Sequence, residues 1–388
     1  MSSEIHYDLQ KLTELRKELH KNAELSNAEH TTASILKNFI KAFDPDRIFE
    51  NIGGHGLIFK FKGTSKEALN IGFRADTDAL PIDETIQLDH GSKTKGVAHK
   101  CGHDGHMSMV AGLASILAHH ANRSHNYYLL FQPAEEIGEG AQNMVEFIQK
   151  EDSIQLDHLF GLHNLPGFPL GEIVIKEGVF APASTGITIE LFGKTSHAAE
   201  PENGISPATA MVNIISALQK LKEGLQLEGN ALCTVIHAEL GEIAFGTSPG
   251  YAAVRATLRA EYDQDLNQLI SKVKNIAEET AQSEQLKFKV QLTESFPSTV
   301  NDKSSIDFFK NCVQNSTLKA REIEKPFKWS EDFGHYQKIA QTLFFGLGAG
   351  EDHPKLHHET YDFPDDMIPF GVKMYNEIIL NFEKHDGR

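Results

Sequence analysis

The sequence contains little cysteine and tryptophan, and it has no long apolar run. Among 388 residues there are one tryptophan and three cysteines, Cys101, Cys233 and Cys312. A chain of this length can bury a full core without disulfides, and an odd number of widely spaced cysteines argues against a disulfide framework. No run approaches the ~20 apolar residues that span a membrane. A disulfide-stabilised scaffold and a membrane protein are therefore excluded, and reduced thiols are expected.

Basic residues are also scarce. Lysine and arginine total 37 against 54 aspartates and glutamates, which gives a net charge of −17 with neutral histidine. Nucleic acids and anionic membranes require clustered basic residues, so neither is expected as a partner. Residues 1–6 lack the basic and apolar regions of a signal peptide, so a cytoplasmic protein is expected. The 20 histidines are the unusual surplus, because histidine commonly binds metals and moves protons.

Apolar patterning predicts an α/β domain. Apolar residues three and four apart predict a helix over 9–19, and a second helix is expected over 31–43. Short apolar runs, separated by helical patterns at 107–119 and 141–148, cover 57–61, 69–73, 127–131, 158–162 and 173–175. Near-continuous apolar strands that alternate with helices are typical of a sheet covered on both faces.

The pattern changes character near residue 183. The elements expected there follow the order strand, helix, strand, strand, helix, strand, which is the order of a ferredoxin-like unit. They cover 186–192, 207–221, 232–237, 253–258, 264–282 and 287–292. The α/β pattern then resumes, with elements at 306–313, 343–347 and 370–382. We therefore predict an α/β catalytic domain, 1–181 and 295–388, interrupted by an inserted α+β domain, 182–294.

Polar clusters follow four of the apolar runs directly. They are 74–78, 132–136, 163–164 and a loop that holds His353, His357 and His358. Ligands of open α/β sheets bind outside the carboxyl ends of the strands, so these clusters are expected to converge on one site.

A fifth cluster, residues 99–106, is a His-rich loop that opens the helix at 107. Cys101 and His103 stand two apart around Gly102, and both can face one cation at ordinary Zn–S and Zn–N distances. Asp104 and His106 are candidates for orienting ligating imidazoles. The alternative interpretation is a helix-capping loop that happens to be rich in histidine.

Glu135 and Glu136 are adjacent carboxylates at a strand end, where they repel each other unless a cation or a shared proton compensates. In a metal site one of them can ligate while the other takes the proton of a bound water as general base. The alternative is that both begin the following helix, since glutamate is favoured at a helix N-terminus.

His163 and His357 are weak candidates individually, because a lone histidine is more often structural. With Cys101, His103 and a glutamate they supply five donors of mixed type. Five ligands are too many for one tetrahedral zinc with an open position but suit two metals that share a ligand. Cys101 is the expected bridge, because sulfur can hold two borderline cations.

Five motifs, taken in order, resemble the signatures of the M20 metallopeptidase and aminoacylase superfamily. They are 72–81, 101–106, 132–136, 161–164, and 356–357 with 361–363. The branch most resembled includes hippurate hydrolases, N-acyl-amino-acid deacylases and auxin-conjugate hydrolases. The resemblance implies a di-metal domain with an inserted lid domain through which family members commonly form homodimers.

The resemblance also implies roles for individual residues. The implied ligands of two divalent ions (Zn, Mn, Co or Ni) are Cys101, His103, Glu136, His163 and His357. Glu135 is the implied base. His197, which alone would be an exposed loop residue, is implied to hydrogen-bond the developing oxyanion, often from the partner subunit. Arg259, which alone would be a solvent-facing strand residue, is implied to pair with the free carboxylate of the substrate.

The implied reaction is cleavage of the amide bond of an N-acyl amino acid or small peptide by metal-bound hydroxide. The sequence departs from the family pattern at three places. It has Gly-Thr-Ser-Pro at 246–249 where many relatives have Asn-Val-Ile-Pro, Thr-Ser at 195–196 for Gly-Gly, and His-His-Glu at 357–359 for His-Asn-Pro. The departures concern substrate recognition rather than the metal set.

Two other hypotheses stay open. In one, Cys101 is the nucleophile of a thiol hydrolase, with His103 or His163 as its base. In the other, the fold is kept only for binding metal, without catalysis.

Overall fold

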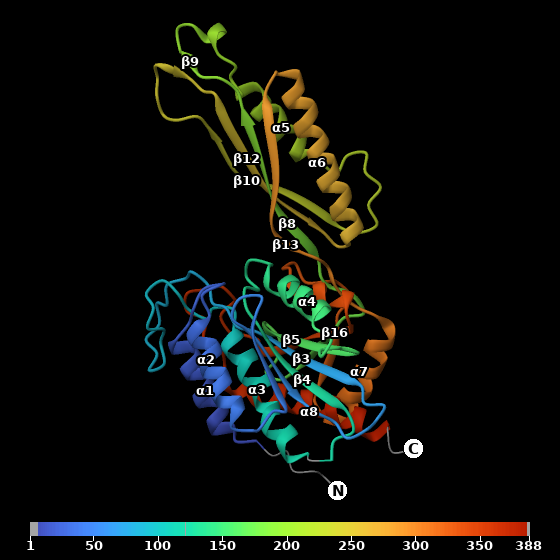
Figure 1. Cartoon of the computed structure of the whole chain (residues 1–388). Helices are drawn as coiled ribbons and strands as arrows, with labels where there is room; N and C mark the ends of the chain where they lie inside the picture. The colour runs from blue at the N-terminus through green and yellow to red at the C-terminus, as the bar shows by residue number, and fades with distance from the viewer. Residues whose placement is uncertain (1–6, 121, 386–388) are drawn as a thin grey trace. The chain divides into compact units, whose positions relative to one another are not determined.

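The computed structural model describes residues 7–120 and 122–385. The expectation about a targeting segment concerns residues 1–6, which lie outside the described part. The chain divides into two compact units, each with its own apolar core (Figure 1). The main unit contains 1–180, 300–325 and 332–388, and the inserted unit contains 181–299 and 326–331. The expected fold class, an α/β domain with an inserted α+β unit, is confirmed.

The main unit is built on an eight-stranded mixed sheet. Its strands are β1 (Arg47–Ile52), β2 (Gly56–Phe61), β3 (Asn70–Asp76), β4 (Asn126–Gln132), β5 (His158–Pro166), β6 (Ile173–Ile175), β15 (Ala320–Glu322) and β16 (Gln341–Gly350). Its helices are α1 (Leu9–Lys21), α2 (His30–Lys41), α3 (His103–His119), α4 (Gly140–Lys150), α7 (Lys303–Ser316) and α8 (Ile368–His385), with short 3-10 turns η2 (Asp332–Lys338) and η3 (Asp365–Met367). A separate two-stranded sheet joins β7 (Gly178–Ala181) to β14 (Thr299–Asn301).

The sheet order is β1-β2-β4-β3-β5-β16-β6-β15. The four central strands β4, β3, β5 and β16 are parallel to one another, with Phe73 of β3 opposite Leu129 of β4 and Phe160 of β5. Nearly every residue of these strands is buried, as expected for strands covered on both faces. Because they run in parallel, their carboxyl ends lie at one edge of the sheet, and the prediction that their polar clusters converge is confirmed.

Helix α3 begins at His103, four residues earlier than the apolar pattern indicated. Nearly all of its residues from His103 to Leu117 are buried, so the helix lacks the polar face from which an amphipathic start can be recognised. It packs on β3, β4 and β5, with α1 and α8 alongside. The early start places His103 inside the first turn of the helix and Cys101 just before it.

The inserted unit is a four-stranded antiparallel sheet with two helices on one face. Its elements are β8 (Ala183–Phe192), α5 (Ala208–Gln219), β10 (Ala231–Leu240), β12 (Tyr251–Ala260), α6 (Asp263–Ser283) and β13 (Lys287–Phe296). The sheet order is β10-β12-β8-β13. Alternate residues of β8 and β12 are buried under the helices, as expected for a sheet packed on one face. A small ribbon of β9 (Ser196–His197) and β11 (Thr247–Ser248) and the turn η1 (Pro201–Asn203) complete the unit.

Within the part of the chain that the structure describes, no helix is both long and apolar enough to cross a membrane.

Candidate functional site

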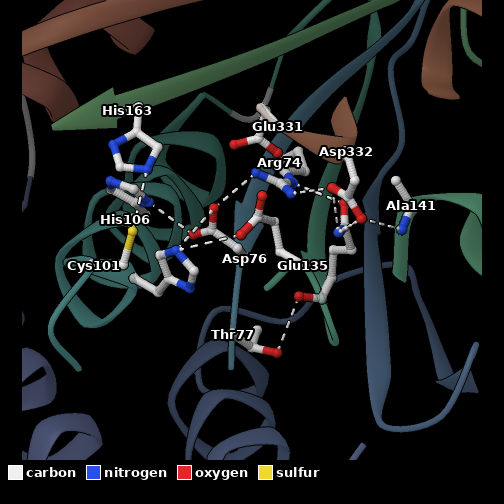
Figure 2. A network of polar contacts seen from close by, with 12 residues as sticks. Arg74, Asp76, Thr77, Cys101, His106, Glu135, Ala141, His163, Glu331 and Asp332 are labelled. Atoms are coloured by element: carbon white, nitrogen blue, oxygen red, sulfur yellow. Dashed lines mark hydrogen bonds and ion pairs between the residues drawn. The ribbon is translucent and has the colours of Figure 1, made fainter. Parts of the chain in front are cut away.

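The site lies where β3, β4 and β5 end in the main unit. At the end of β3, Arg74 is buried and donates from Nε to Gln132, from Nη1 to Asp76 and from Nη2 to Asp332, at 2.8, 2.8 and 2.9 Å (Figure 2). Asp332 also accepts from the backbone N–H of Ala141, in the first turn of α4. This network of charged and polar side chains fixes the orientation of the Asp76 side chain at the end of the strand.

Cys101 lies in a loop whose conformation requires glycine at the next residue, Gly102. Gly102 has φ +92°, and a Cβ at this residue would lie 2.7 Å from the side-chain nitrogen of Asn164. The thiol of Cys101 is buried, and its Sγ lies 3.6 Å from Nε2 of His163. The close approach of the loop to β5 therefore brings a sulfur and an imidazole together.

His103 enters the same pocket from the first turn of α3. Its Nδ1–H donates to the carbonyl oxygen of Asp78 at 2.9 Å, which leaves Nε2 as the free ring nitrogen. Nε2 is buried and has no hydrogen-bond partner among the described residues. It lies 3.7 Å from a carboxylate oxygen of Asp76, 3.7 Å from Glu136 and 3.9 Å from Glu135.

Glu135 and Glu136 lie in a turn between β4 and α4, not in the helix. Helix α4 begins only at Gly140, so the alternative that both glutamates start this helix is wrong. The turn is set by Ala134, which has a left-handed backbone at φ +53°. The N–H of Glu136 donates to Asp78 at 3.0 Å, and both glutamates reach within 4 Å of His103.

His163 and His357 reach the pocket from distant parts of the sequence. His163 donates from Nδ1 to the carbonyl oxygen of Asn164 at 2.9 Å, so its Nε2 faces Cys101. The side chain of His357 is 52% exposed, and its backbone is left-handed, with φ +63°. Its backbone N–H donates to the carbonyl oxygen of Lys100, and its Nε2 lies 3.9 Å from Glu136.

The donors form two triads that share one sulfur. Cys101, His103 and His163 offer donor atoms within 4.8 Å of one another, and so do Cys101, Glu136 and His357. A thiolate, three imidazoles and a carboxylate are the donors that zinc and similar divalent metals accept. Nε2 of His103 and Oε1 of Glu136 are buried without a hydrogen-bond partner among the described residues, as is expected of atoms that serve as metal ligands. The residues therefore fit a two-metal centre.

The electrostatics of the pocket also favour a metal centre. Burial, with the charges of Glu136, Glu135 and Asp76, raises the pKa of the Cys101 thiol well above its usual value. Burial alone would lower the pKa of His103, but Asp76, Asp78 and Glu136 raise it to about 10. Burial raises the pKa of Glu136 to about 7. The carboxylates that cause these shifts surround the donor atoms, a setting in which a divalent cation would stabilise the ionised thiol and carboxylate.

Of the two residues expected to orient ligating imidazoles, His106 packs against both His103 and His163, with ring centroids 5.5 and 4.8 Å apart. The rings of His103 and His163 are held by backbone carbonyls. Asp104, on the first turn of α3, accepts instead from Nδ1 of His20 in α1 at 2.8 Å. His106 lies between Asp76 and Asn164, at 2.7 and 2.6 Å from their side-chain oxygens.

The helix-capping alternative for the loop 99–106 is also wrong. The N-cap position of α3 is Gly102, and no side chain caps the helix there.

Several supporting residues were not singled out from the sequence. Asp76, Asp78 and Arg74 were visible as polar residues after β3, but their partners could not be assigned without the fold. Asp332 carried no signal, because it follows no apolar strand and its partner Arg74 is 258 residues away.

His197 and Arg259 belong to the inserted unit. His197 is exposed in β9, where it pairs with Thr247, and its Nδ1 accepts from the N–H of Ala199 at 3.0 Å. Arg259 is half-buried in β12 rather than solvent-facing, and it donates to Ser330 Oγ at 2.9 Å and to the carbonyl oxygen of Lys328. Burial lowers the pKa of Arg259 from its ordinary value.

Comparison with known proteins gives a consistent result. The model of peptidase family M20/M25/M40 matches residues 72–381. The chain is 30% identical to the hippurate hydrolase of Campylobacter jejuni over 97% of this chain and 98% of that protein. It is 29% identical to IAA-amino acid hydrolase ILR1-like 2 of Arabidopsis thaliana, over 96% and 85%. Among solved structures it is similar to Bacillus subtilis YXEP, a dinuclear metal binding peptidase from the M20 family, with a TM-score of 0.80, 25% identity, and 97% and 98% coverage.

Proposed function

The chain belongs to peptidase family M20/M25/M40, and we propose on that basis that it hydrolyses the amide bond of N-acyl amino acids or small peptides. It is an enzyme of this metallo-hydrolase family, related to hydrolases of amino-acid conjugates. The observation that supports the proposal best is the pair of donor triads that share Cys101 beside Glu135.

Two divalent ions, of zinc, manganese, cobalt or nickel, would be held by the two triads. The proposed ligands are Cys101, His103, Glu136, His163 and His357. Such ions lower the pKa of a coordinated water and polarise a carbonyl oxygen. The chain contributes the fixed positions of the donors, because the rings of His103 and His163 are held by backbone carbonyls.

Glu135 is the proposed general base. Its side chain is buried and belongs to the cluster of His103, Glu135 and Glu136, so its carboxylate lies beside the donors that would hold the ions. A carboxylate there can accept the proton of the attacking water and pass it to the leaving amine. Because Glu136 occupies the neighbouring donor position, the adjacent glutamates divide the two tasks.

His197 and Arg259 are proposed to act on the substrate from the inserted unit. Because Nδ1 of His197 accepts the N–H of Ala199, the proton of the neutral ring is on Nε2. An Nε2–H on an exposed ribbon is a suitable donor to a developing oxyanion. The guanidinium of Arg259 suits a substrate carboxylate. Replacing His197 by alanine is expected to lower kcat, and replacing Arg259 by methionine is expected to raise KM.

We further propose a homodimer formed through the inserted unit. Strand β10 is the edge of its sheet, and Leu232 and Ile236 on this strand are 53% and 62% exposed. Val212 on α5 is 56% exposed. Exposed apolar side chains on an edge strand support pairing with a second copy. Sedimentation should give a dimer, and a fully active monomer would contradict the proposal.

The test of the proposed function is a substrate panel combined with metal analysis. Purified protein is loaded with Zn²⁺, Mn²⁺ or Co²⁺, its metal content is determined, and hydrolysis of N-acetyl and N-benzoyl amino acids and of dipeptides is measured. We expect two metals per chain and turnover of at least one class. Bound metal without any turnover would favour a protein that only binds metal.

The thiol-hydrolase alternative is disfavoured by the site itself. A nucleophilic cysteine needs a lowered pKa, whereas the surroundings raise the pKa of Cys101. Burial and His106 hold the pKa of His163 well below its usual value, so this imidazole is a poor base. The alternative predicts activity that survives chelators, and our proposal predicts activity that does not.

A further inference from the structure

The loop between α1 and α2 contains a buried glutamate, Glu29, whose side chain does not cap the helix that it precedes. Glu29 is the N-cap residue of α2, a position from which a side chain ordinarily accepts the first N–H groups of the helix. The carboxylate of Glu24 accepts them instead, from Thr31 and Thr32 at 3.0 and 2.9 Å. Glu29 makes no capping bond, and only 1% of its surface is exposed.

The carboxylate of Glu29 reaches the turn that carries the candidate base. Its Oε1 accepts the backbone N–H of Ala134 at 2.9 Å. Ala134 is fully buried and left-handed, at φ +53°, a conformation that is unfavourable for alanine. The residue directly after it is Glu135. The hydrogen bond that Ala134 donates to Glu29 thus holds the backbone at the residue before Glu135, where its direction sets the direction of the Glu135 side chain.

The same loop also supports Glu136. Ser26 donates from Oγ to Asp78 at 2.7 Å, and the same oxygen of Asp78 accepts the N–H of Glu136 at 3.0 Å. Residues 24–29 therefore hold the turn from both sides, one contact at Ala134 and one through Asp78.

We propose that Glu29 is a positioning residue for the proposed reaction. By accepting the N–H of Ala134, it keeps this residue left-handed and so directs Glu135 and Glu136 into the metal pocket. The inference rests on the proposed function for the role of Glu135.

The surroundings of Glu29 argue against a merely stabilising role. Its Oε2 is buried and has no hydrogen-bond partner among the described residues. Burial raises the pKa of Glu29 to about 7, although hydrogen bonds with backbone groups, including that from Ala134, oppose the increase. An apolar side chain of the same length would avoid the burial of an unsatisfied oxygen. Burial of Oε2 thus costs stability, while Oε1 holds the backbone of Ala134.

The test compares two substitutions that preserve the length of the side chain. Glu29→Gln keeps an oxygen that can accept from Ala134, whereas Glu29→Met does not. With the best substrate of the panel, Glu29→Met is expected to lower kcat by about 10-fold to 100-fold, and Glu29→Gln to retain most of it. The Tm of Glu29→Met is expected to change little, because removal of the unsatisfied Oε2 and loss of the acceptor for the buried N–H of Ala134 have opposite effects.

The decisive variant combines Glu29→Met with Ala134→Gly. Glycine adopts a left-handed backbone without strain, so the turn no longer needs the hydrogen bond. The double variant is expected to recover most of the lost kcat. A purely structural role for Glu29 would give no such recovery, because glycine at 134 replaces none of its packing.

Glu24→Met is the matched control. It removes a carboxylate of the same loop that caps α2 but touches neither glutamate of the turn. It is expected to lower Tm and leave kcat unchanged, whereas Glu29→Met is expected to lower kcat with little change in Tm.

Binding of Co²⁺, followed by calorimetric titration, gives a readout that does not require turnover. Because Glu136 is a proposed ligand, Glu29→Met should weaken binding of at least one ion by about tenfold, with recovery in the double variant. If the wild type bound metal but hydrolysed no substrate, the proposed function would fail while this titration still tested the positioning role. Unchanged kcat and Co²⁺ affinity in Glu29→Met, or no recovery in the double variant, would overturn the inference.

Discussion

Glu135 is the side chain on which the proposed chemistry depends most directly. Replacing it by glutamine keeps the size of the side chain but removes the proton acceptor. We expect kcat of Glu135→Gln to fall by about 10²-fold to 10⁴-fold, the usual contribution of a general base. Its metal content should stay at the wild-type value, because Glu136 and not Glu135 belongs to the proposed ligand set. Steady-state kinetics and metal analysis of one preparation check both; full activity would remove Glu135 from this role.

Alanine at Gly102 would introduce both backbone strain and a steric clash, and alanine at Gly224 would introduce the strain alone. Its φ is +92°, and a Cβ would meet the amide of Asn164 at 2.7 Å. Gly224 is also left-handed, at φ +78°, but a Cβ there would meet nothing within 4 Å. Both alanine variants incur backbone strain of about 1–3 kcal/mol, and only Gly102→Ala adds the clash.

Gly102→Ala should therefore unfold at a lower temperature than Gly224→Ala and bind less metal. Thermal unfolding and metal analysis measure the two effects. Equal Tm values and full metal content in both variants would show that the loop does not require glycine.

At the scale of the elements, α1 is joined to α3 by a buried ionic network. His20 lies between two carboxylates, Asp104 at 2.8 Å and Glu84 at 2.9 Å. Lys100 also contacts Glu84, and Arg16 lies near Asp104. Burial alone would lower the pKa of His20, but the hydrogen bonds and charges of Asp104 and Glu84 raise it to about 9.

This network predicts a pH-dependent stability. The pKa of His20 is higher in the folded protein than the value of about 6.5 expected in the unfolded chain, so the charged ring stabilises the fold below pH 6.5. The contribution, of order 3 kcal/mol, is lost as pH rises from 6.5 through 9. The Tm difference between wild type and His20→Gln should therefore shrink over this range. A difference that stays constant from pH 6 to pH 9.5 would contradict the network.

The elements that could be predicted from sequence are those with strong periodicity. The buried strands β3, β4, β5 and β16 and the helices α1 and α8 follow from apolar runs and helical spacing. The start of α4 was predicted within one residue, but that of α3 was not, because α3 is buried all around and lacks a polar face. The contact from Glu29 to Ala134 spans 105 residues and has no sequence signature.

Part of the candidate site could also be predicted from the sequence. The convergence of Cys101, His103, Glu136 and His163 could be expected, since parallel strands end at the same edge. What holds these side chains could be predicted only in part. His106 packs against the rings of His103 and His163, but Asp104 contacts His20 instead. Both rings donate to backbone carbonyls, whose directions are set by the fold.

At the scale of the whole molecule, two units with separate cores should respond differently to metal. All five proposed ligands belong to the main unit, and none belongs to the inserted unit. A ligand that binds only the folded state stabilises it, by about 4 kcal/mol at a free concentration 1,000 times its Kd. Removing metal with a chelator should therefore lower the unfolding temperature of the main unit and leave that of the inserted unit unchanged.

Calorimetry with and without a chelator measures this difference, and Cys101→Ala combined with His103→Ala is the control. The transition of the main unit in this variant should no longer respond to the chelator. A chelator effect of equal size on both units, or one that persists in the variant, would mean that the metal binds elsewhere.

The proposed enzyme requires two cations, one held by each triad, that share Cys101. Anomalous diffraction from crystals of the zinc-loaded protein locates each ion by its own scattering. We expect two peaks, one beside His103 and His163 and the other beside Glu136 and His357, both within bonding distance of Cys101 Sγ. One peak alone, or two peaks of which neither touches this sulfur, would overturn the proposal that Cys101 is a shared ligand.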